Sequence, residues 1–163
     1  MDKKQNVTLV DHALLIKSPI SEVFDFLANH ENYALWYPKV ISIEAANQLP
    51  HGTVGKIYKE AIGLPTGRIQ SINITVVESR APELFVTEGD FAPLHPRMEV
   101  WLSEKSASET LLNWSFYSRS QSMIGRLLIR MFLKKTLERD SATGLARMKA
   151  MVENQASSQS VGH

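Results

Sequence analysis

The sequence predicts an α+β domain in which an antiparallel β-sheet of about six to seven strands precedes a long C-terminal α-helix. Between residues 40 and 117, short segments rich in apolar and β-branched residues alternate with turn residues, a pattern typical of strands joined by tight connections. A stretch with helical periodicity and no proline follows over residues 122–153. Strands that succeed one another through short turns pair as an antiparallel meander. We therefore expect a single domain over residues 1–153, a size that one hydrophobic core can stabilise.

One strand and two short helices are predicted before the meander. Residues 7–17 are rich in apolar and β-branched side chains and predict the strand. Ser21 is the predicted N-cap of the first helix, because a serine hydroxyl can accept a hydrogen bond from a free backbone N–H group. Three apolar residues then share one helical face: Val23, Phe26 and Leu27. The polar residues 29–32 interrupt this helix, and residues 33–37 predict another helical turn that ends before Pro38.

The meander is predicted from segments with the composition of strands: residues 40–45, 54–62, 69–78, 84–88, 97–103 and 110–117. Within the third segment, Ile72, Ile74 and Val76 recur at every second position, so we expect them to share one buried face. The longest connection covers residues 89–96 and contains Pro93 and Pro96.

The last element is predicted as a long helix whose apolar surface changes direction. The early apolar residues share one face: Ile124, Leu127, Leu128 and Met131. The later ones lie about a quarter turn away: Leu133, Leu137, Leu145, Met148 and Val152. We therefore expect a bend, a break or a change of contact surface around residues 132–136. Residues 154–163 are rich in serine and glutamine and are predicted to form a disordered tail.

The composition excludes several classes of site. The chain has no cysteine, which rules out disulfides, thiolate catalysis and cysteine-based zinc sites. It has no glycine-rich phosphate loop, nucleophile elbow or H-E-x-x-H motif, so we predict neither a metal nor another cofactor. The net charge of +1 does not indicate nucleic-acid binding. Because no signal-peptide core and no run of about 18 apolar residues is present, we expect a cytoplasmic protein.

The segment from Ile16 to Pro38 carries the most specific pattern in the chain. The matching residues are Ile16, Ser18, Pro19, Val23, Phe24, Leu27, Asn29, Tyr33, Trp36 and Pro38. Residues 54–55, 78–84 and 145–153 contain later matches to the same pattern. Together with the order of elements, it resembles the START/Bet v-like helix-grip superfamily, also described as SRPBCC or polyketide cyclase/dehydrase-like. The resemblance covers residues 7–153.

The resemblance implies a strongly curved sheet that wraps the long helix and leaves an apolar cavity between them. Members of the superfamily bind lipids, sterols, polyketides, plant hormones or flavonoids in such a cavity, and some catalyse ring closure or dehydration. Since one fold hosts many functions, the identity of the ligand has to come from individual residues.

Aromatic and flexible apolar side chains are the predicted lining of the cavity: Trp36, Tyr58, Phe85, Phe91, Met98, Trp114, Phe116, Leu127 and Met131. Strand alternation places Trp114 and Phe116 on one face of their strand, and it places Met98 on the face opposite Trp101. Methionine suits a surface that accommodates varied apolar ligands. The alternative for each residue is that it fills an ordinary hydrophobic core. No catalytic residue is assigned.

Polar residues on the strands are the alternative source of chemistry: Glu60, Glu88, Asp90, Arg97, Glu99 and Asn113. A carboxyl group that faces the cavity would have its pKa raised by desolvation and would become a candidate acid or base. Glu99 is expected outside, because Met98 and Val100 on either side of it point inward. Among the histidines, His30 lies in the predicted helix break, and His12 is separated from Asp11 because adjacent strand residues face opposite ways.

A basic strip recurs at every fourth residue of the long helix: Arg126, Arg130 and Lys134. Such a strip is often a solvated face. The alternative is a membrane-docking surface, which the neighbouring apolar residues would complete: Met123, Ile124, Leu127 and Leu128.

The leading functional hypothesis is therefore that the protein binds or carries a small hydrophobic molecule, such as a lipid, a polyketide or an aromatic metabolite. The alternative is a polyketide or aromatic cyclase or dehydratase that uses the same cavity. A third hypothesis is a protein-interaction module. The oligomeric state is left open.

Overall fold

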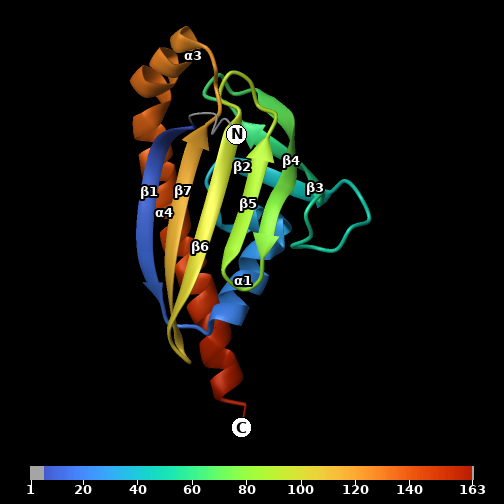
Figure 1. Cartoon of the computed structure of the whole chain (residues 1–163), viewed down its shortest axis with the longest axis vertical. Coiled ribbons are helices and arrows are strands. Elements are labelled where there is room, and N and C mark those ends of the chain that lie inside the picture. The colour runs from blue at the N-terminus through green and yellow to red at the C-terminus, as the bar shows by residue number, and fades with distance from the viewer. Residues whose placement is uncertain (1–5, 163) are drawn as a thin grey trace.

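The computed structural model describes residues 6–162 and contains a seven-stranded antiparallel sheet curved around a long helix (Figure 1). The strands are β1 (Val7–Ile16), β2 (Val40–Ala45), β3 (Ile57–Gly63), β4 (Ile69–Arg80), β5 (Leu84–Gly89), β6 (Pro96–Ser106) and β7 (Glu109–Ser118). Their order across the sheet is β1-β7-β6-β5-β4-β3-β2. The meander is thus continuous from β2 to β7, and β1 adds to its far edge. This confirms the predicted α+β helix-grip fold.

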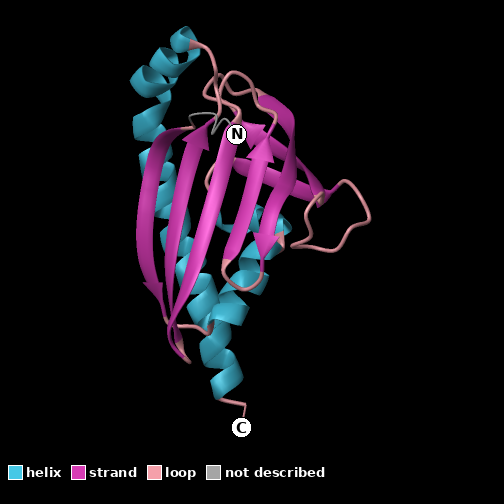
Figure 2. Cartoon of the chain, in the orientation of Figure 1, coloured by secondary structure: helices cyan, strands magenta, loops and turns pink. Residues whose placement is uncertain are grey.

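All helices lie on one side of the sheet (Figure 2). They are α1 (Ile20–Ala28), the 3₁₀ turn η1 (His30–Asn32), α2 (Tyr33–Trp36), α3 (Met123–Leu128), the π-helical turn η2 (Ile129–Leu133) and α4 (Lys134–Ser160). Within residues 6–162, none of these helices combines the length and the hydrophobicity that crossing a membrane requires.

The first helix begins two residues earlier than predicted. Pro19 occupies the N-cap position of α1 and Ser21 lies within the first turn, so the prediction of a Ser21 cap is wrong. Ser18 fixes this end of the helix instead: its hydroxyl donates to Glu22 Oε2 at 3.1 Å and its carbonyl accepts from Thr110 Oγ1 at 2.8 Å. The predicted stop before Pro38 is confirmed, because Tyr37 has an extended backbone with φ −86° and ψ 124°.

The predicted change within the C-terminal helix occurs at the π-helical turn η2. The Lys134 N–H group donates to the Ile129 carbonyl, five residues earlier, instead of to the carbonyl four residues earlier. The extra residue rotates the apolar surface between α3 and α4. Helix α4 then continues past Glu153 to Ser160, which corrects the predicted disorder of residues 154–160. Ser157 and Ser158 each donate to the carbonyl four residues earlier, at 3.0 and 2.9 Å. His163 lies outside the described residues.

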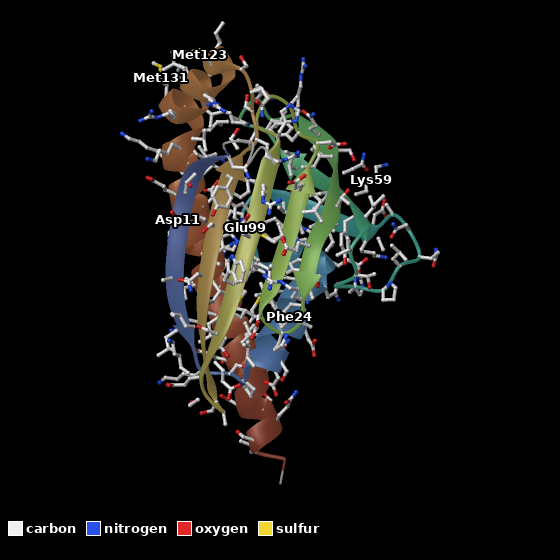
Figure 3. All side chains as sticks on the ribbon, viewed as in Figure 1. Asp11, Phe24, Lys59, Glu99, Met123 and Met131 are labelled. Carbon is white, nitrogen blue, oxygen red and sulfur yellow. The ribbon has the colours of Figure 1, made fainter. Side chains whose placement is uncertain are left out.

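Strand alternation places the core as predicted. The inward side chains of the central strands are buried: Ile72, Ile74, Val76, Met98, Val100, Leu102, Leu112 and Trp114. Trp101 is on the outer face, where the Arg80 guanidinium lies 5.3 Å from the centre of its ring. Glu99 is on the outer face too, bonded to Arg97 Nε at 2.7 Å (Figure 3). The main core therefore lies on the concave face, although Leu84 and Val86 of β5, which pair with Trp101 and Glu99 on the outer face, are buried as well.

Candidate functional site

A cavity of about 300 Å³ lies between the concave face of the sheet and the helices. Apolar residues of the strands supply one wall: Val40, Ile62, Ile72, Ile74, Met98 and Phe116. The helical segment and two connecting loops supply the other: Leu64, Phe91, Leu94, Phe132, Leu133 and Leu137. Phe132 is 68% exposed, whereas His30 and Glu60 are 3% and 5% exposed. The cavity therefore has an open end at η2 and a buried end beside η1.

The buried end carries a cluster of polar side chains on short elements. The ring of His30 in η1 stacks on Tyr33 of α2 with centres 4.9 Å apart, and Tyr33 stacks on Tyr37 at 4.7 Å. Glu60 of β3 faces them, with its Oε2 atom 3.9 Å from His30 Nε2. Asn29 caps η1 by accepting a hydrogen bond from Glu31 N at 3.2 Å, which sets the position of His30.

Burial keeps this cluster largely uncharged. Desolvation raises the pKa of Glu60 from 4.5 to about 7 and lowers the pKa of His30 from 6.5 to about 3. Desolvation also raises the pKa values of the Tyr33 and Tyr37 phenols. At neutral pH His30 is a neutral imidazole, the phenols are protonated and the raised pKa of Glu60 favours its uncharged form. The cluster thus offers hydrogen-bond donors and acceptors without a fixed ion pair.

The charges at the side of the cavity are compensated. Asp140 of α4 pairs with Lys39 Nζ at 3.2 Å and with Arg139 Nη2 at 3.1 Å. Lys39 has a positive φ of 72°, a conformation that is uncommon outside glycine. The ion pair ties α4 to the start of β2. Among residues 6–162, no group of three or more His, Asp or Glu side chains has the arrangement of a metal site.

This architecture agrees with a family of known proteins. The family model described as "Polyketide cyclase / dehydrase and lipid transport" matches residues 8–153. The chain belongs to this family. No curated protein matches it.

Solved structures share the fold at low sequence identity. The Zhui aromatase/cyclase from Streptomyces sp. R1128 superposes with a TM-score of 0.68 and 19% identity, over 90% of this chain and 93% of that one. A START superfamily protein from Mycobacterium smegmatis gives 0.63 and 10%, over 92% and 97%. The di-domain ARO/CYC StfQ of the steffimycin biosynthetic pathway gives 0.71 and 13% over 95% of this chain, which spans only 53% of StfQ. Family and neighbours together indicate a cyclase-like or START-like ligand-binding fold.

The structure brings only part of the predicted lining of this family member to the cavity. Phe91, Met98 and Phe116 line it. Four others are buried in the core, outside the lining: Trp36, Tyr58, Phe85 and Trp114. Strand alternation correctly predicts the inward face of Trp114, but it does not predict which inward residues the helices cover.

Three contacts show how the core residues are covered. Phe85 lies under α1, where its ring meets Phe24 edge-on with centres 6.4 Å apart. Tyr58 directs its hydroxyl to His51 Nδ1 at 2.7 Å. Trp36 packs against α4 at Gly144, where a Cβ atom would lie 3.1 Å from the Trp36 carbonyl oxygen.

Leu127 and Met131 were also predicted to line the cavity, and the structure places both outside it. They are 58% and 65% exposed. The reason for Leu127 is that α3 extends beyond the ends of the strands (Figure 1). Met131 lies on the side of η2 that faces solvent, whereas its neighbours Phe132 and Leu133 line the cavity.

The residues that sequence analysis missed are those of the polar cluster, in particular Tyr33 and Tyr37. Both are predicted to lie in a helical turn and Tyr33 also matches the superfamily pattern, but neither is predicted as a site residue, although their spacing of four places them on one helical face. Glu60 was left open among the polar strand residues. Its position two residues after Tyr58 and two before Ile62 puts it on the inward face of β3, and this spacing was the available evidence.

Proposed function

We propose that the protein binds a small, uncharged hydrophobic molecule that carries a hydroxyl or carbonyl group at one end. The observation that supports this most directly is the cavity of about 300 Å³ with apolar walls and a neutral polar cluster at its buried end. Ligand sites of proteins are commonly of this kind, mostly apolar with a few convergent polar groups.

Affinity in such a site would come from burial of apolar area, at about 25 cal/mol per Å². Orientation would come from hydrogen bonds to His30, Tyr33 or Glu60. A carboxylate ligand is disfavoured, because the desolvation that raises the pKa of Glu60 would also disfavour a carboxylate placed beside it, and Lys39 is already paired with Asp140. Neutral phenols, quinones and polyketide-like ketones fit better than fatty acids.

The test is native mass spectrometry of the freshly purified chain, followed by a thermal-shift series with flavonoids, quinones and fatty acids. We expect co-purified mass or a rise in Tm with neutral aromatic ligands. Met98→Trp and Leu137→Trp fill the cavity from the sheet and from the helix, and both should abolish the shift. Ala142→Trp on the exposed face of α4 is the matched control. No shift with any ligand class, or an equal shift in both cavity variants, would contradict the proposal.

One observation also favours a second function, a cyclase or dehydratase. Glu60, with its pKa raised to about 7, and the neutral His30 imidazole lie 3.9 Å apart in the cavity wall. A carboxyl group with a pKa near 7 suits acid–base catalysis of the elimination of water. The Glu60 carboxylate would take the proton next to a carbonyl and then give it to the departing hydroxyl, so that a double bond and one water form, while the neutral His30 imidazole holds the substrate by a hydrogen bond.

Glu60→Gln separates the two functions, since glutamine keeps the shape and can still form hydrogen bonds. For a dehydratase, the loss of absorbance-detected turnover of a β-hydroxy ketone should be 10²-fold or more, with ligand binding retained. Wild-type protein that binds such ketones but never dehydrates them would contradict the enzyme function and leave the binding function intact.

A further inference from the structure

The start of the C-terminal helical segment presents large apolar side chains that the fold does not cover. Met123, Ile124 and Met131 are 85%, 73% and 65% exposed. In Figure 3, Met123 and Met131 project from the end of the molecule, past the ends of the strands. We call residues 123–135 the helix tip. Contiguous exposed apolar surface of this kind indicates an interaction site.

The orientation of the helix tip is fixed by contacts on its inner side. Ile129 is 1% exposed. A Cβ atom on Gly125 would lie 2.9 Å from Ser120 Oγ, so the helix sits directly on the preceding loop. Ser122 Oγ caps the helix by accepting from Gly125 N at 3.1 Å, and Arg126 Nε donates to the Ser120 carbonyl at 2.9 Å. The exposed side chains therefore keep facing outward.

The helix tip is also strongly cationic. It carries Arg126, Arg130, Lys134 and Lys135, and no acidic residue occurs from position 119 to position 137. Lys134 Nζ has only a 4.0 Å contact with Glu138 on the exposed surface. Arg130 and Lys135 form no ion pair with any residue in 6–162. Apolar and cationic side chains thus share one end of the molecule.

We propose that the helix tip docks on the surface of anionic phospholipid bilayers. Apolar side chains of an amphipathic helix insert at the boundary between headgroups and acyl chains, while Lys and Arg attract anionic headgroups. A second copy of the chain is a poorer occupant, because two tips face to face would bring their cations together without a carboxylate between them. Charge complementarity therefore favours the anionic lipid surface.

Docking in this way would place the open end of the cavity against the bilayer. Phe132 belongs to the helix tip and also lines the cavity, and Leu133 and Leu137 continue the apolar path inward. Bilayer docking itself does not require that the cavity bind a lipid, so it stands or falls independently of the proposed binding function.

Vesicle co-sedimentation of the full chain tests the docking. We expect binding to vesicles of phosphatidylcholine and phosphatidylglycerol at 3:1, little binding to pure phosphatidylcholine, and weaker binding as salt rises. Arg130→Glu/Lys135→Glu should weaken binding about 30-fold or more, since each cation near an anionic surface contributes about fivefold. Met123→Gln/Ile124→Gln/Met131→Gln should weaken it about tenfold or more while preserving helix propensity.

Arg147→Glu is the matched charge control. It lies exposed on α4, about 25 Å along the helix from Arg130 at 1.5 Å per residue, and it should bind like the wild type. Equal loss with Arg147→Glu would overturn the proposal in favour of non-specific attraction. A wild-type chain that stays in the supernatant, or that forms a dimer which the glutamine variant dissociates, would overturn it too. Met98→Trp should still sediment, which distinguishes failure of docking from failure of ligand binding.

Discussion

Single side chains of the buried cluster owe their chemistry to burial alone. Glu60 and Glu99 are both strand carboxylates in the sequence, yet Glu99 meets Arg97 at 2.7 Å on the outer face while Glu60 faces the cavity. The pKa of Glu60 is raised to about 7 because no cation close to it replaces the water it loses. His30 is neutral for the same reason, with its pKa lowered to about 3.

Replacing Glu60 by glutamine should change how stability depends on pH. A folded-state pKa of about 7 against 4.5 in the unfolded chain means that Glu60 contributes stability below pH 4.5 and that this contribution is lost as pH rises through 7. Urea unfolding of the wild type should lose up to about 3 kcal/mol between pH 4.5 and 8.5 relative to Glu60→Gln.

The histidine provides the internal check on that measurement. His30 has a lowered pKa, so its contribution is present above pH 6.5 and is lost as pH falls toward 3, in the wild type and in Glu60→Gln alike. The contradicting outcome is a difference in the free energy of unfolding between the wild type and Glu60→Gln that does not change with pH. It would show that folding does not raise the pKa of Glu60.

For single residues, the sequence predicts the face of a strand on which a side chain lies, because side chains alternate between the two faces. The two-residue period gave the correct faces for Met98, Trp101 and Phe116. It contains no information about the depth of a side chain, which is why Tyr58 was expected in the lining and instead bonds His51. The pKa of Glu60 depends on desolvation by residues distant in the chain. The sequence therefore predicts only that a carboxyl group would have a raised pKa if it faced the cavity.

Among the elements, α4 and α2 come into close backbone contact. Gly144 of α4 faces Trp36, and a Cβ there would lie 3.1 Å from the Trp36 carbonyl oxygen and 3.2 Å from the Pro38 ring. The Lys39–Asp140 pair adds a tie one helical turn earlier. The deep end of the cavity is therefore set by a backbone contact, and the rest of the helix can leave space for a ligand.

Gly144→Val should destabilise the protein by about 2 kcal/mol, because the side chain would push α4 away from α2. Thr143→Val, at the exposed neighbouring position, places the same β-branched residue in the helix and should have little effect. Chemical denaturation of both variants measures the difference, and equal stability would show that the α2–α4 contact can relax.

The helices and strands could be predicted where neighbouring residues determine their type and their ends. The strands and the stop before Pro38 came from alternation and proline geometry. The start of β3 was misplaced by three residues, from 54 to 57, because Gly55 adopts φ +90° and turns the chain. The change in helix direction was visible in the apolar pattern, whereas its form as a π-helical turn was not.

On the scale of the whole molecule, the first strand and the last helix are held together directly. Ser141 of α4 donates to the Glu138 carbonyl at 3.1 Å and lies 2.8 Å from His12 Nε2 of β1. The His12 ring and the Ser141 hydroxyl are thus hydrogen-bonded between β1 and α4. This contact spans 129 positions of the chain, and it closes the sheet edge against the helix.

Ser141→Ala should therefore cost about 1–2 kcal/mol, since it leaves His12 Nε2 without this hydrogen-bond partner. Hydrogen exchange should accelerate most in β1, the edge strand that the bond holds. Ser157→Ala removes a comparable hydroxyl on the exposed end of α4 and should leave both readouts unchanged. Faster exchange spread evenly over all strands would contradict a local role for this contact.

The placement of the polar cluster at the closed end gives the cavity a direction. In the proposed binding mode, a molecule that enters past Phe132 reaches His30 and Glu60 with its polar group leading and its apolar part trailing. Such a ligand would enter and leave in one orientation. Its apolar end would be the last part to be enclosed on binding and the first to emerge on release. Modifying the trailing end of a ligand should therefore alter how fast it leaves more than how it is recognised.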